Sequence, residues 1–153
     1  MNLILWRHAE AEDTAANDLA RQLTTKGRKQ AQHVAKWLRP RLEDDAVILV
    51  SPAARTIQTA EALTDQYRVV REIAPGASAD QVLAAAGWSH GVAPTVVVVG
   101  HQPTLGEVAA RLLHGDATRG LSLKKGALWW FASREHHGDE TAVLLAAMSP
   151  DLV

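Results

Sequence analysis

The chain has 153 residues, of which 47% are apolar and 22% are charged, a balance typical of an ordinary globular domain. It contains no cysteine, which excludes disulfide bonds, thiolate metal sites and a cysteine nucleophile. The formal net charge of −1 provides no basic field for nucleic acid, and no apolar segment approaches the roughly 20 residues of a membrane-spanning helix. We therefore expect one cytoplasmic domain over residues 1–153, with neither nucleic acid nor membrane as a partner.

Strand-like and helix-like segments alternate along the chain. Short runs of apolar and β-branched residues predict strands that are covered on both faces, as in a parallel sheet. These strands span residues 2–6, 46–50 and 95–99. Apolar residues at three- and four-residue spacing predict helices between and after the strands. These helices span residues 25–42, 52–65, 78–86 and 103–113.

Residues with known preferences mark several helix ends. Thr24 or Thr25 can cap the start of the first helix, because a hydroxyl accepts a hydrogen bond from a free backbone N–H. Pro40 is expected to end or kink the last turn of that helix. Ser51 is expected to cap the second helix, and Gly87 to end the third.

The C-terminal part of the sequence predicts a different arrangement. Residues 127–133 and 141–148 are strand-like and flank a polar turn at residues 136–139, which indicates an antiparallel hairpin with a loop of several residues. Together, the elements predict an α/β fold. We expect a single three-layer α/β/α domain whose central sheet is mainly parallel, with an antiparallel pair at one edge.

Chemistry-bearing side chains follow directly after three of the predicted strands. Arg7 and His8 follow the first strand, and His101 follows the third. Ser51 follows the second strand, with Arg55 about one helical turn later. Ligands of parallel α/β sheets bind at the carboxyl ends of the strands, so we expect these side chains to meet in one site.

Two arginines and two histidines at one sheet edge favour phosphoryl chemistry. Guanidinium groups that lie close together need an anion between them, and they bind phosphate oxygens in a bidentate manner. A neutral imidazole is a good nucleophile near pH 7, so His8 could accept a phosphoryl group and pass it to water. His101 could donate to the phosphoryl oxygens as their charge shifts. The sequence has no HExxH motif, Asp-x-Asp pair or phosphate-binding lysine loop, so we expect no metal and no cofactor.

The same segments resemble the signatures of the histidine phosphatase superfamily. The Arg-His signature is matched by Leu5-Trp6-Arg7-His8-Ala9-Glu10-Ala11, and a second signature by Ser51-Pro52-Ala53-Ala54-Arg55-Thr56-Ile57-Gln58-Thr59-Ala60. A third is matched by Val98-Val99-Gly100-His101-Gln102-Pro103, and the Leu-Thr-x-x-Gly segment by residues 23–27. The short length and residues 123–126 are similar to the small bacterial phosphohistidine phosphatases of the SixA type. The resemblance implies a phosphoglycerate mutase-like fold.

The resemblance also implies roles for individual residues. His8 is implied to be the phosphoryl acceptor, and Arg7, Arg55 and His101 are implied to complete a pocket for phosphate or another tetrahedral oxyanion. Three further residues are candidates for substrate binding, namely Asp18, Arg21 and Ser51, although Asp18 and Arg21 could equally form an ion pair within their loop. The implied partner is a protein that carries phosphohistidine.

The segment after the second helix departs from the mutase-like members of the family. Those members carry a general-acid glutamate there, whereas residues 71–77 offer only Glu72. An alkoxide leaving group needs a proton, but a phosphorylated imidazole leaves more easily, particularly when its ring is protonated. Only about twenty residues separate Arg71 from Thr95, so we expect an open pocket. Both features favour phosphohistidine on a protein over a sugar phosphate.

Three alternatives remain. One is a broad-specificity phosphomonoesterase or a mutase of the same superfamily. A second is a non-catalytic module that binds phosphate or a phosphoprotein, although such a module has no need of the Arg7-His8 pair. A third is a histidine-liganded metalloenzyme, which would lose activity with chelators.

Other conspicuous residues have structural interpretations. The pair His136-His137 is interpreted as part of a solvated turn, and the run Trp129-Trp130-Phe131 as core packing. The basic face of the first helix, with Lys26, Arg28, Lys29 and Lys36, is interpreted as a solvated face that could also steer an acidic partner protein.

Overall fold

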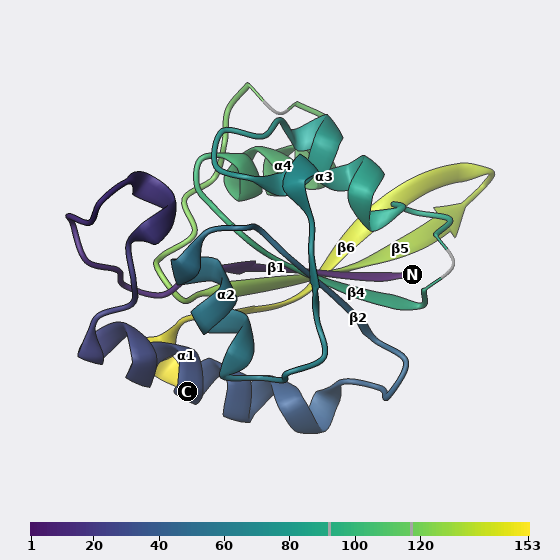
Figure 1. Cartoon of the computed structure of the whole chain (residues 1–153). Helices are drawn as coiled ribbons and strands as arrows, with labels where there is room; N and C mark the ends of the chain where they lie inside the picture. The colour runs from purple at the N-terminus through teal and green to yellow at the C-terminus, as the bar shows by residue number, and fades with distance from the viewer. Residues whose placement is uncertain (92, 117) are drawn as a thin grey trace.

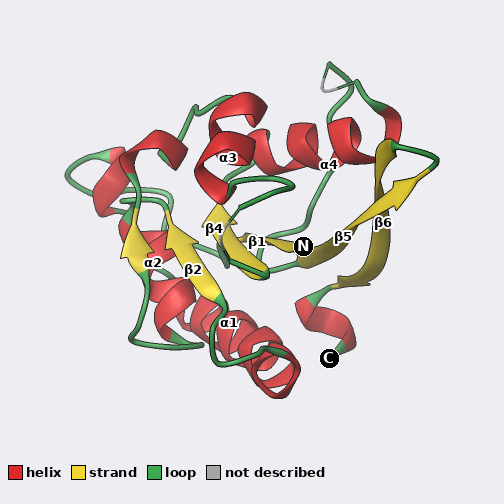
Figure 2. Cartoon of the chain, turned by 90° about the vertical axis from the view of Figure 1, so that its right-hand side faces the viewer, coloured by secondary structure: helices red, strands yellow, loops and turns green. Residues whose placement is uncertain are grey.

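One six-stranded sheet with helices on both faces organises residues 1–91, 93–116 and 118–153, which are the residues that this computed structural model describes (Figures 1 and 2). The strands are β1 Asn2–Arg7, β2 Val47–Val50, β3 Arg68–Val69, β4 Thr95–Gly100, β5 Leu128–His136 and β6 Asp139–Met148. The helices are α1 Thr25–Leu38, α2 Ala54–Glu61, α3 Ala79–Ala86 and α4 Thr104–His114. Short 3-10 segments are η1 Asp18–Ala20, η2 Arg39–Arg41, η3 Arg71–Ile73 and η4 Pro150–Leu152.

The strand order is β3-β2-β4-β1-β5-β6. The first four strands of this order are parallel, and β5 and β6 are antiparallel to their neighbours. The predicted fold class is therefore confirmed. The sequence did not predict β3, because two residues are too few to show a periodicity.

Alternate residues of the buried strands face two separate cores. Leu3, Leu5 and Val98 pack with α3 and α4 on one face of the sheet. Ile4 and Trp6 pack on the other face, where α1 and α2 lie (Figure 2). Both faces are covered, which is why these strands are apolar at every position rather than at every second one.

Helix ends agree with the prediction in two cases and differ in a third. Thr24 caps α1 by accepting from the N–H of Gly27, and the α-helix ends at Leu38, two residues before Pro40. Ser78 caps α3 in a capping box, and Gly87 ends that helix in a left-handed conformation. The prediction that Ser51 caps the second helix is wrong, because α2 begins only at Ala54 and the Ser51 hydroxyl is hydrogen-bonded elsewhere.

The C-terminal hairpin is tighter than predicted. The β5 and β6 strands pair as far as His136 and Asp139, so the turn consists of His137 and Gly138. These two residues have φ angles of 53° and 82°, which are the positive values of a two-residue hairpin turn. The predicted loop of several residues is therefore wrong. Phe131 is fully buried, as the core-packing interpretation expects, and Trp130 donates to the Asn2 side chain at 3.1 Å.

No helix in the described part of the chain combines the length and apolar character that crossing a membrane requires.

Candidate active site

The carboxyl ends of three adjacent strands bring the predicted residues together. Arg7 at the end of β1 pairs with Gly100 at the end of β4, and Val50 of β2 pairs with Val99. The ladder continues one residue further, because the N–H of His8 donates to the Gly100 carbonyl at 3.1 Å. The residues that follow these strands therefore face one another, as the sequence predicts.

His8 is a buried, neutral imidazole with one free nitrogen. Its Nδ1 is 2.7 Å from the carbonyl oxygen of Ala9, which can only accept, so Nδ1 carries the ring proton. Burial lowers the pKa of His8 to about 4, and the positive charges of Arg55 and Arg7 add to this effect. The residue is 7% exposed. Its Nε2 thus keeps an unprotonated lone pair at neutral pH.

Hydrogen bonds to carbonyl and carboxylate oxygens of the protein hold the two arginines of the site in place. Arg7 donates from Nη1 to the Leu123 carbonyl at 2.8 Å. Arg55 donates from Nη1 to the Asp18 carbonyl at 2.8 Å and from Nη2 to the Asp18 carboxylate at 3.1 Å. These contacts fix the guanidinium planes, and Arg55 is 4% exposed.

Buried polar atoms without a partner concentrate at this site. In the described ranges, four buried side-chain nitrogen or oxygen atoms lack a hydrogen bond, and three of them are Nε of Arg7, Nε of Arg55 and Nδ1 of His101. Buried donors are nearly always paired in folded proteins. A tetrahedral oxyanion placed among them would accept from both guanidinium groups, so the donor set fits a phosphoryl group.

His101 lies beside His8, with the two ring centroids 5.4 Å apart. Its Nε2 is hydrogen-bonded to the Ser51 hydroxyl at 2.6 Å. Burial lowers the pKa of His101 to about 3, and the neighbouring His8 and Arg55 contribute. Ser51 is fully buried, and its hydroxyl contacts this histidine. Its position is therefore that of a residue that orients His101.

A cavity of about 270 Å³ opens above these groups. Its described lining carries four cationic side chains and a single carboxylate, that of Asp13, in addition to the two histidines. The cations are Arg7, Arg21, Arg55 and Lys125. Such a charge balance favours an anionic ligand. Among the described residues, no group of three or more His, Asp or Glu side chains is arranged to hold a metal ion.

Asp18 and Arg21 lie at the rim of the site. Arg21 lines the cavity and is paired through Nε with the Asp18 carboxylate at 3.2 Å. Asp18 is 59% exposed, and its hydrogen bond to Arg55 lowers its pKa. Asp18 thus contacts two of the arginines that line the cavity, Arg21 and Arg55. Glu72 is exposed in η3 and is not part of the described lining.

Sequence reasoning missed two groups of the site. Asp13 lines the cavity from an irregular loop that carries no motif. Thr59 accepts from the Ala9 N–H at 3.1 Å and donates to the Arg55 carbonyl at 2.7 Å, so it joins the segment after His8 to α2. Thr59 belongs to the second signature, so its position in that motif could have identified it as part of the site.

Comparisons with known proteins agree with the fold and the motifs. Residues 3–78 match the model of the histidine phosphatase superfamily (branch 1). The phosphohistidine phosphatase SixA of Escherichia coli strain K12 is 33% identical over 124 residues, which cover 76% of each chain.

Two solved structures have nearly the same fold over nearly the whole chain. A putative phosphohistidine phosphatase SixA from Nakamurella multipartitia is 30% identical with a TM-score of 0.82 and covers 97% of this chain and 95% of its own. A protein histidine phosphatase SixA complexed with tungstate is 26% identical with a TM-score of 0.83. The match covers 99% of this chain and 98% of that structure's chain. Tungstate is a tetrahedral oxyanion, like phosphate. The chain therefore belongs to the histidine phosphatase superfamily and is of the SixA type.

Proposed function

We propose that the chain is a phosphohistidine phosphatase that transfers the phosphoryl group from a phosphohistidine protein to Nε2 of His8 and then to water. The observation that carries this proposal is the geometry around His8. Its Nδ1 proton is fixed by Ala9 and its Nε2 lone pair is free, and three residues with an unpaired buried nitrogen, Arg7, Arg55 and His101, line the same cavity. A nucleophile and a set of oxyanion donors thus share one cavity.

In the first step, the lone pair of His8 Nε2 attacks phosphorus, and the P–N bond to the substrate histidine breaks. When the other nitrogen of the substrate ring carries a proton, the ring leaves as neutral imidazole and needs no acid from the enzyme. Arg7 and Arg55 neutralise the charge on the phosphoryl oxygens, and Nδ1–H of His101 donates to one of them. This step suits a cavity whose described lining contains no glutamate.

In the second step, water attacks phosphorus, and the P–Nε2 bond breaks. Both protons of the water leave with the phosphate as H2PO4⁻, and the bonding electron pair returns to Nε2. His8 becomes neutral again, with its proton still on Nδ1 and held by Ala9. The low pKa of His8 keeps the free enzyme ready for the next cycle.

The choice of substrate rests on two supports. Relatives named phosphohistidine phosphatase match most of the chain. Glu72 lies outside the described lining, so it does not supply the proton that an alkoxide leaving group needs, which disfavours a phosphomonoesterase or a mutase. A module that only binds phosphate would gain nothing from a buried, oriented nucleophile.

We also propose that the reaction needs no metal, that residues 1–153 act as one domain, and that the protein works in the cytoplasm. Two guanidinium groups can supply the charge neutralisation that a metal would give. The two cores share a single sheet. A chain without cysteine has no disulfide to require an oxidising compartment.

A turnover assay tests the proposal. Wild type and His8→Ala are compared on a phosphohistidine protein and on p-nitrophenyl phosphate, with a chelator present. Turnover of the phosphohistidine protein that is lost in His8→Ala supports the proposal. Turnover of the small ester alone would identify a general phosphomonoesterase, and phosphate binding without turnover would identify a binding module. Loss of wild-type activity with the chelator would overturn the metal-free mechanism.

A further inference from the structure

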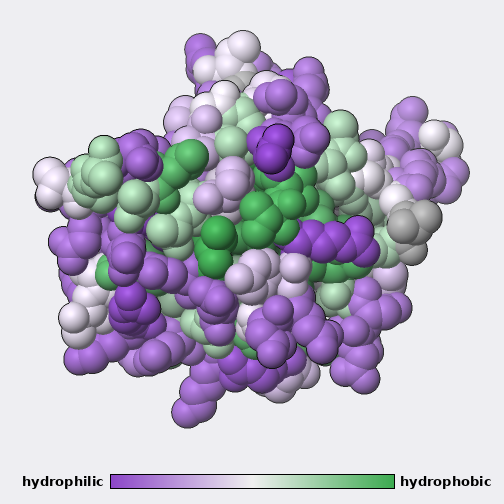
Figure 3. All heavy atoms as spheres, in the orientation of Figure 1, coloured by the Kyte–Doolittle hydropathy of each residue, from purple (hydrophilic) through white to green (hydrophobic). Residues whose placement is uncertain are grey.

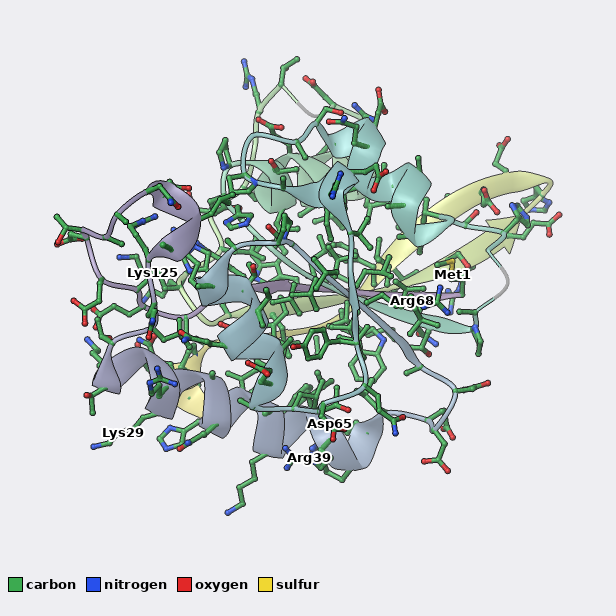
Figure 4. All side chains as sticks on the ribbon, in the orientation of Figure 1. Met1, Lys29, Arg39, Asp65, Arg68 and Lys125 are labelled. Atoms are coloured by element: carbon green, nitrogen blue, oxygen red, sulfur yellow. The ribbon has the colours of Figure 1, made fainter. Side chains whose placement is uncertain are left out.

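All five lysines of the chain lie in two segments that flank the candidate active site. Three are on α1, namely Lys26, Lys29 and Lys36, and two are in the loop before β5, namely Lys124 and Lys125. All five side chains are exposed, and Lys125 lines the cavity. Figure 4 labels Lys29 and Lys125, which both lie toward the left-hand side of the view. We call these five residues the lysine surface.

The two lysine-bearing segments lie next to each other beside His8. The N–H of Gly126 donates to the His8 carbonyl at 2.9 Å. A Cβ built on Gly126 would lie 3.4 Å from Cβ of Gln30 on α1. The same Gln30 accepts from the Glu10 N–H at 2.9 Å. The lysine surface therefore begins at the rim of the cavity and continues along α1, a helix about 21 Å long.

The charge of this surface is poorly compensated. Residues 19–42 contain seven Lys or Arg and no Asp or Glu, and residues 118–134 contain four Lys or Arg and no Asp or Glu. None of the ion pairs in the described ranges includes a lysine. Nearby carboxylates are those of Asp18, which pairs with Arg21, of Glu10, which accepts from Thr24, of Asp13 and of Asp151 in η4. The lower part of Figure 3, over α1, is mainly hydrophilic.

This local charge contrasts with the whole chain, whose net charge is −1. The acidic residues that balance it lie elsewhere in the sequence, for example in the run Glu43-Asp44-Asp45 beyond the end of α1. Separation of charge over one molecule produces a local field that orients a charged partner and raises its association rate.

We infer that the lysine surface docks an acidic face of the protein that carries the phosphohistidine, an inference that rests on the proposed function. The cavity of about 270 Å³ admits a phosphoryl group and its imidazole, so the rest of a substrate protein must lie over the rim. Lys125 lies at that rim, and the lysine surface continues from it along α1. Carboxylates there would steer the substrate into register with His8 while leaving the chemistry unchanged.

The test compares kcat/KM on two peptides that each carry one phosphohistidine, one with glutamates and one with glutamines around it. The variant is Lys26→Gln/Lys29→Gln/Lys36→Gln, which leaves the cavity lining intact. We expect kcat/KM on the glutamate peptide to fall about tenfold at low salt, the lower end of steering effects. We expect the glutamine peptide to be turned over at the wild-type rate, and the difference to disappear in concentrated salt.

A matched control removes exposed positive charge away from the site. The variant Arg68→Gln/Arg134→Gln changes arginines on β3 and β5, and it should keep the wild-type preference for the glutamate peptide. Equal turnover of the glutamate peptide by wild type and the lysine variant would overturn the docking inference alone, as would an equal loss in the control. Failure of the wild type to hydrolyse either phosphohistidine peptide would overturn the proposed function as well.

Discussion

Replacing Ser51 by alanine should disturb the orientation of the His101 ring while the ring itself stays in the site. The Ser51 hydroxyl is 2.6 Å from His101 Nε2, and both residues are almost fully buried. A buried hydroxyl keeps its proton paired only if it donates, and the partner of the Ser51 hydroxyl is Nε2 of His101. The ring proton of His101 is then placed on Nδ1, the buried nitrogen that has no partner within the described protein. Alanine removes this control over the tautomer.

The expected magnitudes follow from the burial of the pair. Leaving a buried nitrogen unpaired costs about 1–3 kcal/mol of the free energy of unfolding. For a chain of this length that corresponds to a decrease in Tm of roughly 2–12 °C. Loss of one preorganised donor lowers kcat by about 10²–10³. Because Ser51→Ala weakens the orientation of His101 and leaves the donor in place, we expect a decrease of about tenfold to a hundredfold.

The assay is kcat on a phosphohistidine peptide at neutral pH, with Tm measured on the same samples. Ser51→Thr is the control, because it keeps the hydroxyl and should retain more activity than Ser51→Ala. A Ser51→Ala variant with wild-type kcat would refute the reasoning, even if its Tm fell. Such a result would reduce Ser51 to a residue that fills the core.

Three further predictions concern the surroundings of the nucleophile. A Cβ at Gly27 would lie 1.9 Å from the Glu10 carbonyl oxygen, so Gly27→Ala should lower the free energy of unfolding by about 1–3 kcal/mol in urea titrations. Asp18→Asn should change stability by less than about 1 kcal/mol, since Asp18 is 59% exposed, and should tighten tungstate binding measured by calorimetry. The pKa values of His8, about 4, and His101, about 3, lie below the ordinary histidine pKa of 6.5, so the unfolded chain binds more protons between these values. The free energy of unfolding should be highest above pH 6.5 and fall as pH drops toward 3. In urea titrations over this range, the double variant His8→Asn/His101→Asn should lose less of its free energy of unfolding than the wild type does.

The sequence predicted the residues of the site because they occupy fixed places relative to the strands. The residue after a parallel strand lies at the carboxyl edge of the sheet whatever the loops do, so His8 and His101 could be placed without coordinates. The apolar runs that define the strands are equally local signals. The β-hairpin was predicted for the same reason, although its two-residue turn was not.

Features that depend on contacts between distant residues escaped prediction. Ser51 looks like a helix cap in the sequence, because Pro52 follows it, but its hydroxyl contacts a histidine 50 residues away. Asp18 is an exposed acid at the start of η1, and its contact with Arg55 depends on how η1 packs against α2. Neither contact leaves a periodic trace in the sequence.

These distant contacts divide the work of the site between two sets of groups. We propose that nitrogens placed by the strand ends and by α2 meet the phosphoryl group, while other residues fix which of those nitrogens carry protons and where the guanidinium groups point. Ser51 does this for His101 and Leu123 for Arg7, and Ala9, the next residue in the chain, does it for His8. A substitution in the second set should therefore keep oxyanion binding while lowering kcat, whereas loss of an arginine from the first set should weaken both.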